Sequence, residues 1–152
     1  MYAYKRGDYR RCLQLSIQNV HTLWCADRGI GVVTHPAFIQ LLDDDIVSLT
    51  ALTLIVKPEC RQNSNDACIG QLTLSLYLVT RCQLKLRHSV TSLVQTLKCI
   101  KRAQRKYDVD RTLDQLTLKL SARKLLGHLQ EVHGISRVRY IPWSRIISVE
   151  LL

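Results

Sequence analysis

Apolar residues recur at helical spacing along most of the chain, and this periodicity limits the possible folds more than any other feature. The first such stretch has apolar side chains at steps of four, four, three and four: Tyr9, Leu13, Ile17, Val20 and Trp24. These steps place the side chains on one face of a helix, whereas a strand would require strict alternation. We therefore predict a helix that buries one face against the rest of the protein.

Helix boundary signals lie at both ends of that stretch. Gly7 and Asp8 precede it, and an aspartate in this position caps the first backbone N–H groups of a helix. The segment DRGIG at residues 27–31 follows it, and its two glycines favour termination. We expect the helix to extend from Asp8 to about this segment.

The remaining chain divides into further helical segments separated by proline, glycine or polar residues. Residues 46–56, IVSLTALTLIV, have the Val and Thr content of a strand, but their acidic start and lack of alternation favour a buried helix. Asp66 is placed to cap the helix after it, and Gly134 to end the last one. The helices that we predict span residues 36–42, 46–56, 67–85, 89–106 and 112–132.

The composition fits helices packed on helices. The chain has 152 residues, enough for one domain with a sizeable core, and 47% of them are apolar. It contains one Phe and two Trp, so Leu, Val and Ile must fill that core. The prediction is an all-α domain of stacked antiparallel helix hairpins over residues 1–134, followed by a short non-helical C-terminal tail at residues 135–152.

Positive charge is concentrated in the second half of the chain. The net charge is +10, and residues 81–152 carry fifteen Lys and Arg against five Asp and Glu, whereas residues 1–80 carry seven of each kind. Such an asymmetry indicates an anionic partner, which is a nucleic acid, an acidic protein or a membrane surface. A solvated basic face that binds nothing is the alternative.

The segment KCIKRAQRK holds the densest group of basic residues. Their spacing of three, one, three and one puts them on one face of the helix predicted for residues 89–106, next to its apolar face. Such a stripe can bind phosphates, or it can simply favour the helix dipole and keep the chain soluble. The candidate polyanion-binding residues are Lys98, Lys101, Arg102, Arg105 and Lys106.

The beginning of the chain resembles a known repeat. The stretch AYKRGDYRRCL at residues 3–13 is similar to the turn and second helix of a tetratricopeptide repeat, and the likeness extends over about residues 3–24. In that family an aromatic residue ends the first helix, a glycine forms the turn, and a tyrosine precedes a small residue that lets the helices approach. The resemblance gives these structural roles to Gly7, Tyr9 and Cys12, with Cys12 in the place of the usual alanine.

A second stretch resembles such a unit more weakly, and the first unit is incomplete. In residues 74–97, Tyr77 would end one helix and Ser89 or Val90 would open its partner, but the turn glycine is missing. Two to three incomplete units would fit the chain. Because the first helix of the opening repeat is absent, we expect the chain to be either the C-terminal fragment of a longer protein or the product of a fragmentary gene model.

The opening stretch is also similar to the helical tails of some large invertebrate proteins. In those proteins, repeats of this kind follow a nucleotidyltransferase-like domain related to cyclic GMP–AMP synthase. That domain carries a catalytic Gly-Ser and paired acidic residues, and nothing in this chain supplies them. The resemblance therefore does not bring the activity with it.

The positions of the six cysteines favour a role in core packing over a metal or redox site. Cys12, Cys82 and Cys99 fall within helical patterns, where we expect them to act as small apolar residues. Cys60 and Cys68 flank a polar loop, and a disulfide between them would require an oxidising compartment. No C-x-x-C pair is present, which argues against a zinc or thioredoxin-like site.

No residue pattern in the sequence favours catalysis. Asp43, Asp44 and Asp45 are consecutive, so on a helix their carboxylates would diverge instead of converging on a cation. The sequence also lacks G-x-S-x-G and a phosphate-binding glycine loop. We expect no enzymatic activity, no cofactor and no bound metal.

The sequence therefore predicts a protein–protein interaction or scaffold module. Stacked hairpins form a concave surface for a peptide or a partner helix, and the basic second half favours an acidic partner segment. The alternative is an accessory nucleic-acid- or polyanion-binding module that uses residues 98–106. Because the sequence shows no apolar signal segment and no run long enough to span a bilayer, we expect a cytoplasmic protein without a membrane partner.

Overall fold

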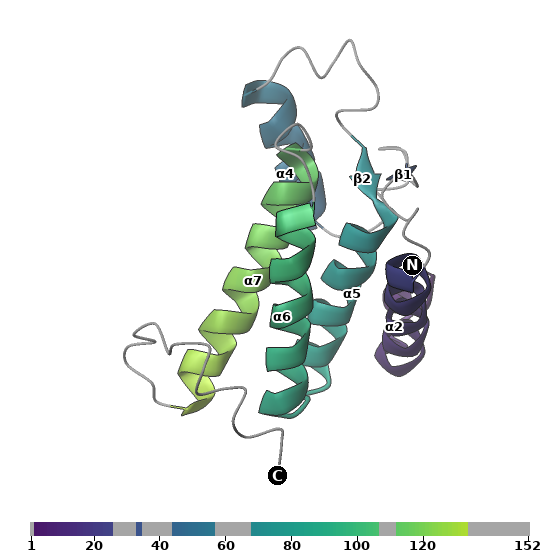
Figure 1. Ribbon diagram of the computed structural model, residues 1–152, viewed down its shortest axis with the longest axis vertical. Coiled ribbons are helices and arrows are strands. Elements are labelled where there is room, and N and C mark those ends of the chain that lie inside the picture. Colours follow the sequence, from purple (N-terminus) through teal and green to yellow (C-terminus); the bar gives the residue numbers. More distant parts are fainter. Residues whose placement is uncertain (1, 26–32, 35–43, 57–67, 107–111, 134–152) are drawn as a thin grey trace.

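The computed structural model describes residues 2–25, 33–34, 44–56, 68–106 and 112–133, which form an all-α fold with one very short strand pair (Figure 1). The elements in chain order are α1 (Tyr2–Lys5), α2 (Tyr9–Cys25), β1 (Val33–Thr34), α4 (Asp44–Val56), β2 (Ile69–Gly70), α5 (Gln71–Lys85), α6 (Val90–Lys106) and α7 (Thr112–His133). The all-α class is confirmed, and so are the predicted helices that correspond to α2, α4, α6 and α7.

Helix α5 lies at the centre of the fold and is buried on nearly every side. Residues 72–80 are all buried, so Thr73, Ser75 and Thr80 lie in the core together with the apolar residues between them. Its Thr80 hydroxyl donates to the Leu76 carbonyl at 2.9 Å, so the polar group is satisfied within the helix. Helices α5, α6 and α7 lie side by side with alternating direction (Figure 1).

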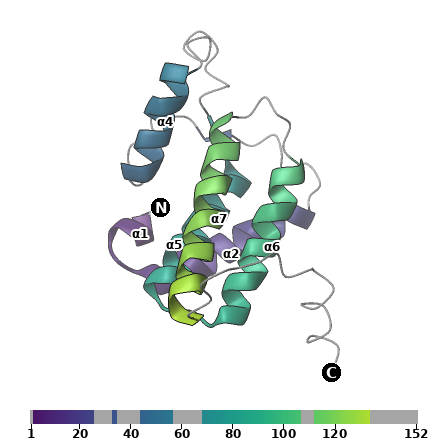
Figure 2. The ribbon, with the colours of Figure 1, turned by 90° about the vertical axis from the view of Figure 1, so that its left-hand side faces the viewer.

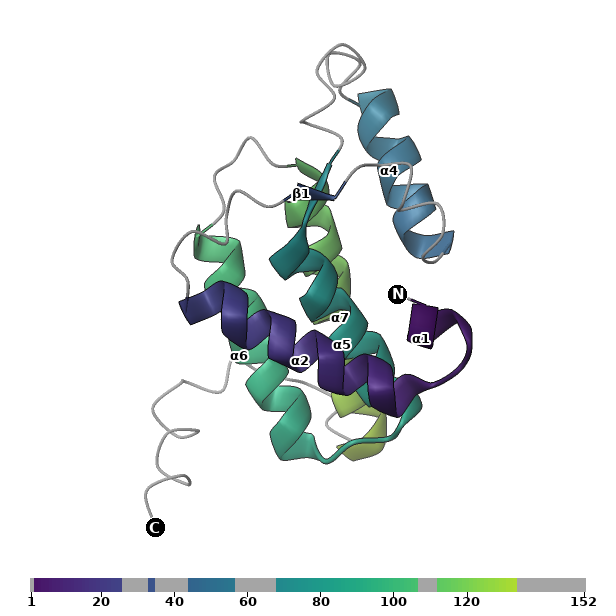
Figure 3. The same cartoon turned by 90° about the vertical axis from the view of Figure 1, so that its right-hand side faces the viewer.

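Two apolar clusters share α5 as their common wall. The first joins α2 to α5 and includes Ile46 of α4, and the second joins α5 to α6 and α7. Figure 3 shows α2 crossing obliquely over α5. The fully buried residues that connect α6 and α7 to α5 in the second cluster are Ile100, Ala103, Leu118 and Leu125.

Helix α4 lies beside α7, as Figure 2 shows, and buries only one of its faces. Ile46 and Thr53 are buried there, whereas Val47, Leu52 and Ile55 are exposed, Ile55 to 68%. The expectation of a buried helix is therefore wrong for half of its surface. An apolar run identifies a helix that can be buried, but only the packed neighbours determine which faces are covered.

A polar network links side chains of four helices. Asp45 of α4 forms ion pairs with Lys124 of α7 and with Arg81 of α5, the latter at 3.7 Å. The Arg81 Nε donates to the Tyr4 hydroxyl of α1 at 3.2 Å. Because these side chains are only partly exposed, the network helps to orient α4 and α1 on the central helix.

The turn between α1 and α2 has the geometry that its sequence indicates. Gly7 has φ +76°, and its N–H donates to the Tyr4 carbonyl at 3.1 Å while the Asp8 N–H donates to the Ala3 carbonyl at 2.9 Å. This is the pattern of a glycine-terminated helix. The Asp8 carboxylate accepts the Arg11 N–H at 3.1 Å, which confirms the predicted cap of α2.

The turn between α5 and α6 repeats that pattern with an arginine in place of the glycine. Arg87 has φ 51°, and the His88 N–H donates to the Gln83 carbonyl at 3.0 Å. The Ser89 hydroxyl then accepts the Ser92 N–H at 3.4 Å at the start of α6. A residue with a Cβ is strained in this left-handed conformation, so the missing turn glycine has an energetic cost.

We expect Arg87→Gly to raise the free energy of unfolding by about 0.5–1 kcal/mol. The substitution relieves the left-handed strain, although the greater freedom of glycine in the unfolded chain offsets part of the gain. Urea unfolding followed by circular dichroism measures the change. The matched control is Gly7→Ala, which should lower the free energy by about 1 kcal/mol through backbone strain alone, because no atom lies within 4 Å of the added Cβ. Destabilisation by Arg87→Gly would contradict this account.

The start of α5 differs from the sequence prediction. The helix begins at Gln71 instead of residue 67, because Ile69 and Gly70 pair antiparallel with Thr34 and Val33. The Gly70 N–H also donates to the buried Asp114 carboxylate of α7 at 2.8 Å. Several predictions fall outside the described residues: the helix at 36–42, the Asp66 cap, Gly134, Cys60 with its loop disulfide, and the tail at 135–152.

Candidate functional site

The predicted polyanion-binding residues all belong to α6, but they differ in exposure. Arg102 and Arg105 are exposed, whereas Lys98 and Lys101 are half-buried and each makes a polar or electrostatic interaction. The Lys106 side chain is not among the described parts. The structure thus leaves Arg102 and Arg105 as the most accessible charges of the predicted stripe.

The predicted repeat-turn residues come together at the start of α2. Gly7 forms the turn, and the Tyr9 ring packs edge-on against the Tyr4 ring with centroids 5.6 Å apart. Cys12 is buried in the cluster between α2 and α5. Gly7 thus lies in the turn between α1 and α2, and Cys12 lies in the contact between α2 and α5.

A groove with mostly apolar walls runs between α2 and α6 over α5. Two adjoining cavities form this α2–α6 groove, and Ile17 lines both of them. The first has a volume of about 530 Å³ and the second about 200 Å³. Their combined size suits several side chains of a peptide better than one enclosed small ligand.

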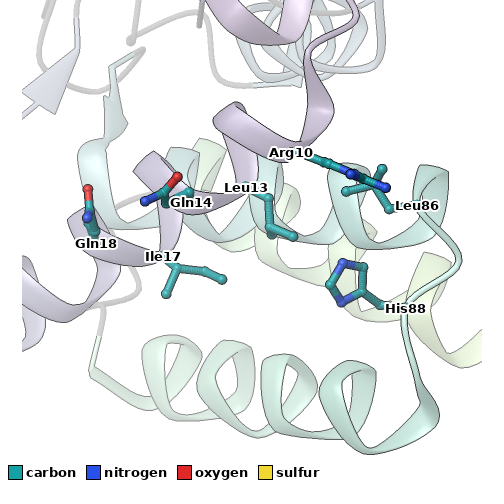
Figure 4. A pocket seen from close by; sticks show the side chains of 7 residues that line it. All are labelled: Arg10, Leu13, Gln14, Ile17, Gln18, Leu86 and His88. Atoms are coloured by element: carbon teal, nitrogen blue, oxygen red, sulfur yellow. The ribbon is translucent and has the colours of Figure 1, made fainter.

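The first cavity lies between the start of α2 and the α5–α6 turn (Figure 4). In Figure 4, Leu13, Ile17 and His88 point into the space between α2 and α6. Ile17 is 48% exposed, so an apolar side chain at the centre of the groove remains open to solvent. The full lining is Arg10, Leu13, Gln14, Ile17, Gln18, Leu86 and His88.

The second cavity continues toward the middle of α6. Its apolar part comes from α2 and α5, and its polar part from α6 and Gln83. The lining residues are Ile17, Val20, Leu76, Val79, Gln83, Ser92, Gln95, Thr96 and Cys99. Apolar surface with a few polar groups is the usual chemistry of a binding site.

A buried hydrogen-bond network holds the floor of the second cavity in place. The Gln83 amide nitrogen donates to the Ser92 hydroxyl at 2.9 Å, and the Thr96 hydroxyl donates to the Gln83 amide oxygen at 2.8 Å. The amide thus has partners at both ends, as a buried polar group requires. The network connects α5 to α6 and sets the position of the α6 wall of the groove.

The margin of the groove is basic. Arg10 lines the first cavity, and Arg102 lies close enough to Cys99 for its charge to act on that thiol. Burial raises the pKa of Cys99, while the Arg102 charge acts in the opposite direction. None of the described residues that line the two cavities is Asp or Glu. The described lining of the groove therefore carries positive charge at Arg10 and no negative charge.

Two other kinds of site are absent from the described residues. No group of three or more His, Cys, Asp or Glu side chains there has an arrangement that could hold a metal ion. None of the helices described combines the length and the apolar character needed to cross a membrane. Asp44 and Asp45 lie in the first turn of α4, as the acidic-start interpretation predicted.

Comparison with known proteins supplies no relative from which a role could be inferred. No protein-family model matches the sequence, and neither the curated proteins nor the solved structures contain a match. A function for this chain therefore has to be inferred from the groove and its charges.

Most residues of the groove could not be identified from the sequence. The apolar period placed Ile17 on the buried face of its helix, yet this residue is nearly half exposed because α2 crosses α5 obliquely. Gln83 and Thr96 carried no local signal, since their partners lie on a different helix. The only hint in the sequence was that a glutamine, Gln83, lies among the residues of α5 whose pattern indicates burial.

Proposed function

We propose that this chain is a protein-interaction module of helix hairpins, and that its α2–α6 groove binds an acidic segment of a partner protein that also carries apolar side chains. The observation that carries the proposal is the combination of the apolar Ile17 at the centre of the groove with arginines beside both cavities. Ligand apolar groups would contact Ile17, and ligand carboxylates would face Arg10 and Arg102.

Ile17 would supply the main apolar contact. It is 48% exposed and lies where the two cavities meet, so a ligand side chain placed there would remove apolar surface from water on both partners. Residues at the centre of an interface, where water is excluded, contribute most to affinity. The half-exposed isoleucine therefore fits the role of an anchor.

The polar groups of the groove suit a peptide. Gln14 and Gln18 on the α2 side and Gln95 on the α6 side each offer an amide that can both donate and accept. Such groups can bond to the backbone of a peptide whatever its side chains are. The resemblance to tetratricopeptide repeats supports the same function, because stacked hairpins of that kind present grooves to peptides.

Peptide selection with a matched pair of variants tests the proposal. Peptides of about 15 residues selected from a random displayed library on the full 152-residue chain should be enriched in acidic and apolar residues. In fluorescence anisotropy, Ile17→Asp should weaken the binding of these peptides at least tenfold, or about 1.4 kcal/mol. The control is Leu15→Asp, on the other side of the same helix, where Leu15 is 49% exposed.

The comparison between the two variants decides the question. Leu15→Asp should change affinity less than twofold, since Leu15 lines neither cavity of the groove. If both substitutions weaken binding equally, or if the selected peptides are basic, the groove is not the binding site. Circular dichroism of each variant shows whether the fold is kept.

The polyanion alternative gives a different pattern of results. A module that binds nucleic acid through α6 would lose affinity for a labelled 15-base-pair duplex when Lys98, Lys101, Arg102 and Arg105 are changed to Gln. Its salt dependence would become shallower, and Ile17→Asp would leave the affinity unchanged. Such a result would favour the nucleic-acid function over the peptide groove.

A further inference from the structure

Two buried cysteines from distant parts of the sequence meet between α2 and α5. Cys12 is 2% exposed and Cys82 is 0% exposed, and both belong to the cluster that joins these two helices. The helices pack closely along this contact, which is the most extensive one in the fold. A bond between the two sulfurs would therefore cross-link the N-terminal helix to the central helix.

The two thiols interact directly. A hydrogen bond between the Cys12 and Cys82 thiols lowers the pKa of Cys12 below its ordinary value despite burial. The same hydrogen bond, together with burial, raises the pKa of Cys82. The Ser16 hydroxyl lies 3.9 Å from the Cys12 sulfur and also lowers the pKa of Cys12. Cys12 is thus the sulfur better able to act as a nucleophile.

A cavity gives small molecules a route to Cys12. Cys12 lines a cavity of about 400 Å³ on the side of α2 opposite the α2–α6 groove. Ser16 and Leu15 of α2 and Gln71 and Leu74 of α5 also line it. A molecule as small as a peroxide can enter such a space, although the cysteine has almost no exposed surface.

We propose that Cys12 and Cys82 form a peroxide-oxidisable pair that closes into a disulfide between α2 and α5. The Cys12 thiolate attacks one peroxide oxygen, the O–O bond breaks, and the departing hydroxide takes a proton to become water. The product is a Cys12 sulfenic acid. The Cys82 sulfur then attacks the Cys12 sulfur, and the second hydroxide leaves with the Cys82 proton as water. Two thiols and one hydrogen peroxide thus yield one disulfide and two waters.

The proposal is tested on the full chain carrying Cys25→Ser. Cys25 is exposed, so its replacement preserves the fold, and it must be removed because trypsin releases Cys12 and Cys25 in one peptide, residues 12–28. The folded protein is treated with one equivalent of hydrogen peroxide, and the remaining thiols are alkylated. After non-reducing digestion, mass spectrometry should show residues 12–28 linked to residues 82–85 as the main product.

Four further readouts accompany the cross-link. The oxidised protein should remain monomeric on a non-reducing gel, and dithiothreitol should restore both thiols. The bond closes a loop of about 70 residues, so the melting temperature should rise by about 10 °C on oxidation. In Cys82→Ser, dimedone should trap Cys12 as its sulfenic acid, because no second sulfur is available.

Other products overturn the proposal. It is wrong if Cys12 or Cys82 joins mainly to Cys60, Cys68 or Cys99, whose tryptic peptides differ in mass. It is also wrong if Cys12 in the Cys25→Ser protein ends as a sulfenic or sulfinic acid without a cross-link. A folded chain in which peroxide oxidises other cysteines but leaves Cys12 reduced would contradict it equally.

Discussion

Replacing Ile100 with alanine should lower the free energy of unfolding by about 3–4 kcal/mol, a large part of the total stability of a domain. Ile100 is 0% exposed and lies in the cluster that joins α6 to α5 and α7. Its removal leaves a cavity that neighbouring leucines from two other helices can fill only partly. Because α6 forms one wall of the groove, peptide affinity should fall with the stability of that helix.

An exposed position on the same helix provides the control for Ile100→Ala. Arg102 is exposed and lies two residues further along α6, so Arg102→Ala should change the free energy of unfolding by less than about 0.5 kcal/mol. Urea unfolding monitored by circular dichroism measures both variants. A loss below about 1 kcal/mol for Ile100→Ala would show that α6 is not packed on α5 and α7 in this way.

Asp114→Ala should destabilise the protein by about 2–3 kcal/mol although it removes only a carboxylate. Asp114 is 0% exposed and accepts the N–H of Gly70, the residue that precedes α5, at 2.8 Å. Without this carboxylate the buried N–H of Gly70 would lose this acceptor. Leaving a buried donor without its acceptor costs more free energy than breaking a hydrogen bond at the surface. Asp114 also lies in the first turn of α7, where a negative charge favours the helix dipole.

The conservative variant Asp114→Asn separates these two contributions. It keeps an acceptor oxygen for Gly70 but removes the charge, so about half of the destabilisation should remain. Amide hydrogen exchange of Gly70 gives a local readout, because its protection should survive in Asp114→Asn and be lost in Asp114→Ala. Equal destabilisation by both variants would show that the charge, not the hydrogen bond, is what matters at this position.

Features set by neighbouring residues could be predicted from the sequence. The apolar period of Tyr9 to Trp24 predicts α2, and Gly7 and Asp8 predict its start, because the hydrogen bonds involved join residues at most five positions apart. The acidic start of α4 and the extents of α6 and α7 were predictable for the same reason. The basic composition of α6 could be read directly, but the half-burial of Lys98 and Lys101 could not.

Features set by distant residues could not be predicted. The start of α5 depends on a strand pair with residues 33–34 and on a carboxylate 44 residues further along the chain. The exposed face of α4 depends on α7 covering one side of it and not the other. No local pattern distinguishes these outcomes, since each results from contacts made only in the folded state.

The candidate site also combines features set by neighbouring residues with features set by distant ones. The sequence by itself determined that the chain is helical, where its first turn lies, and that positive charge gathers in its second half. Only the tertiary structure decided that Ile17 faces an open groove, that Gln83 supports its floor, and that Cys82 interacts with Cys12. The physical reason is that helix periodicity and capping act within a few residues, whereas the crossing of α2 over α5 is set by side-chain packing between segments about 70 residues apart.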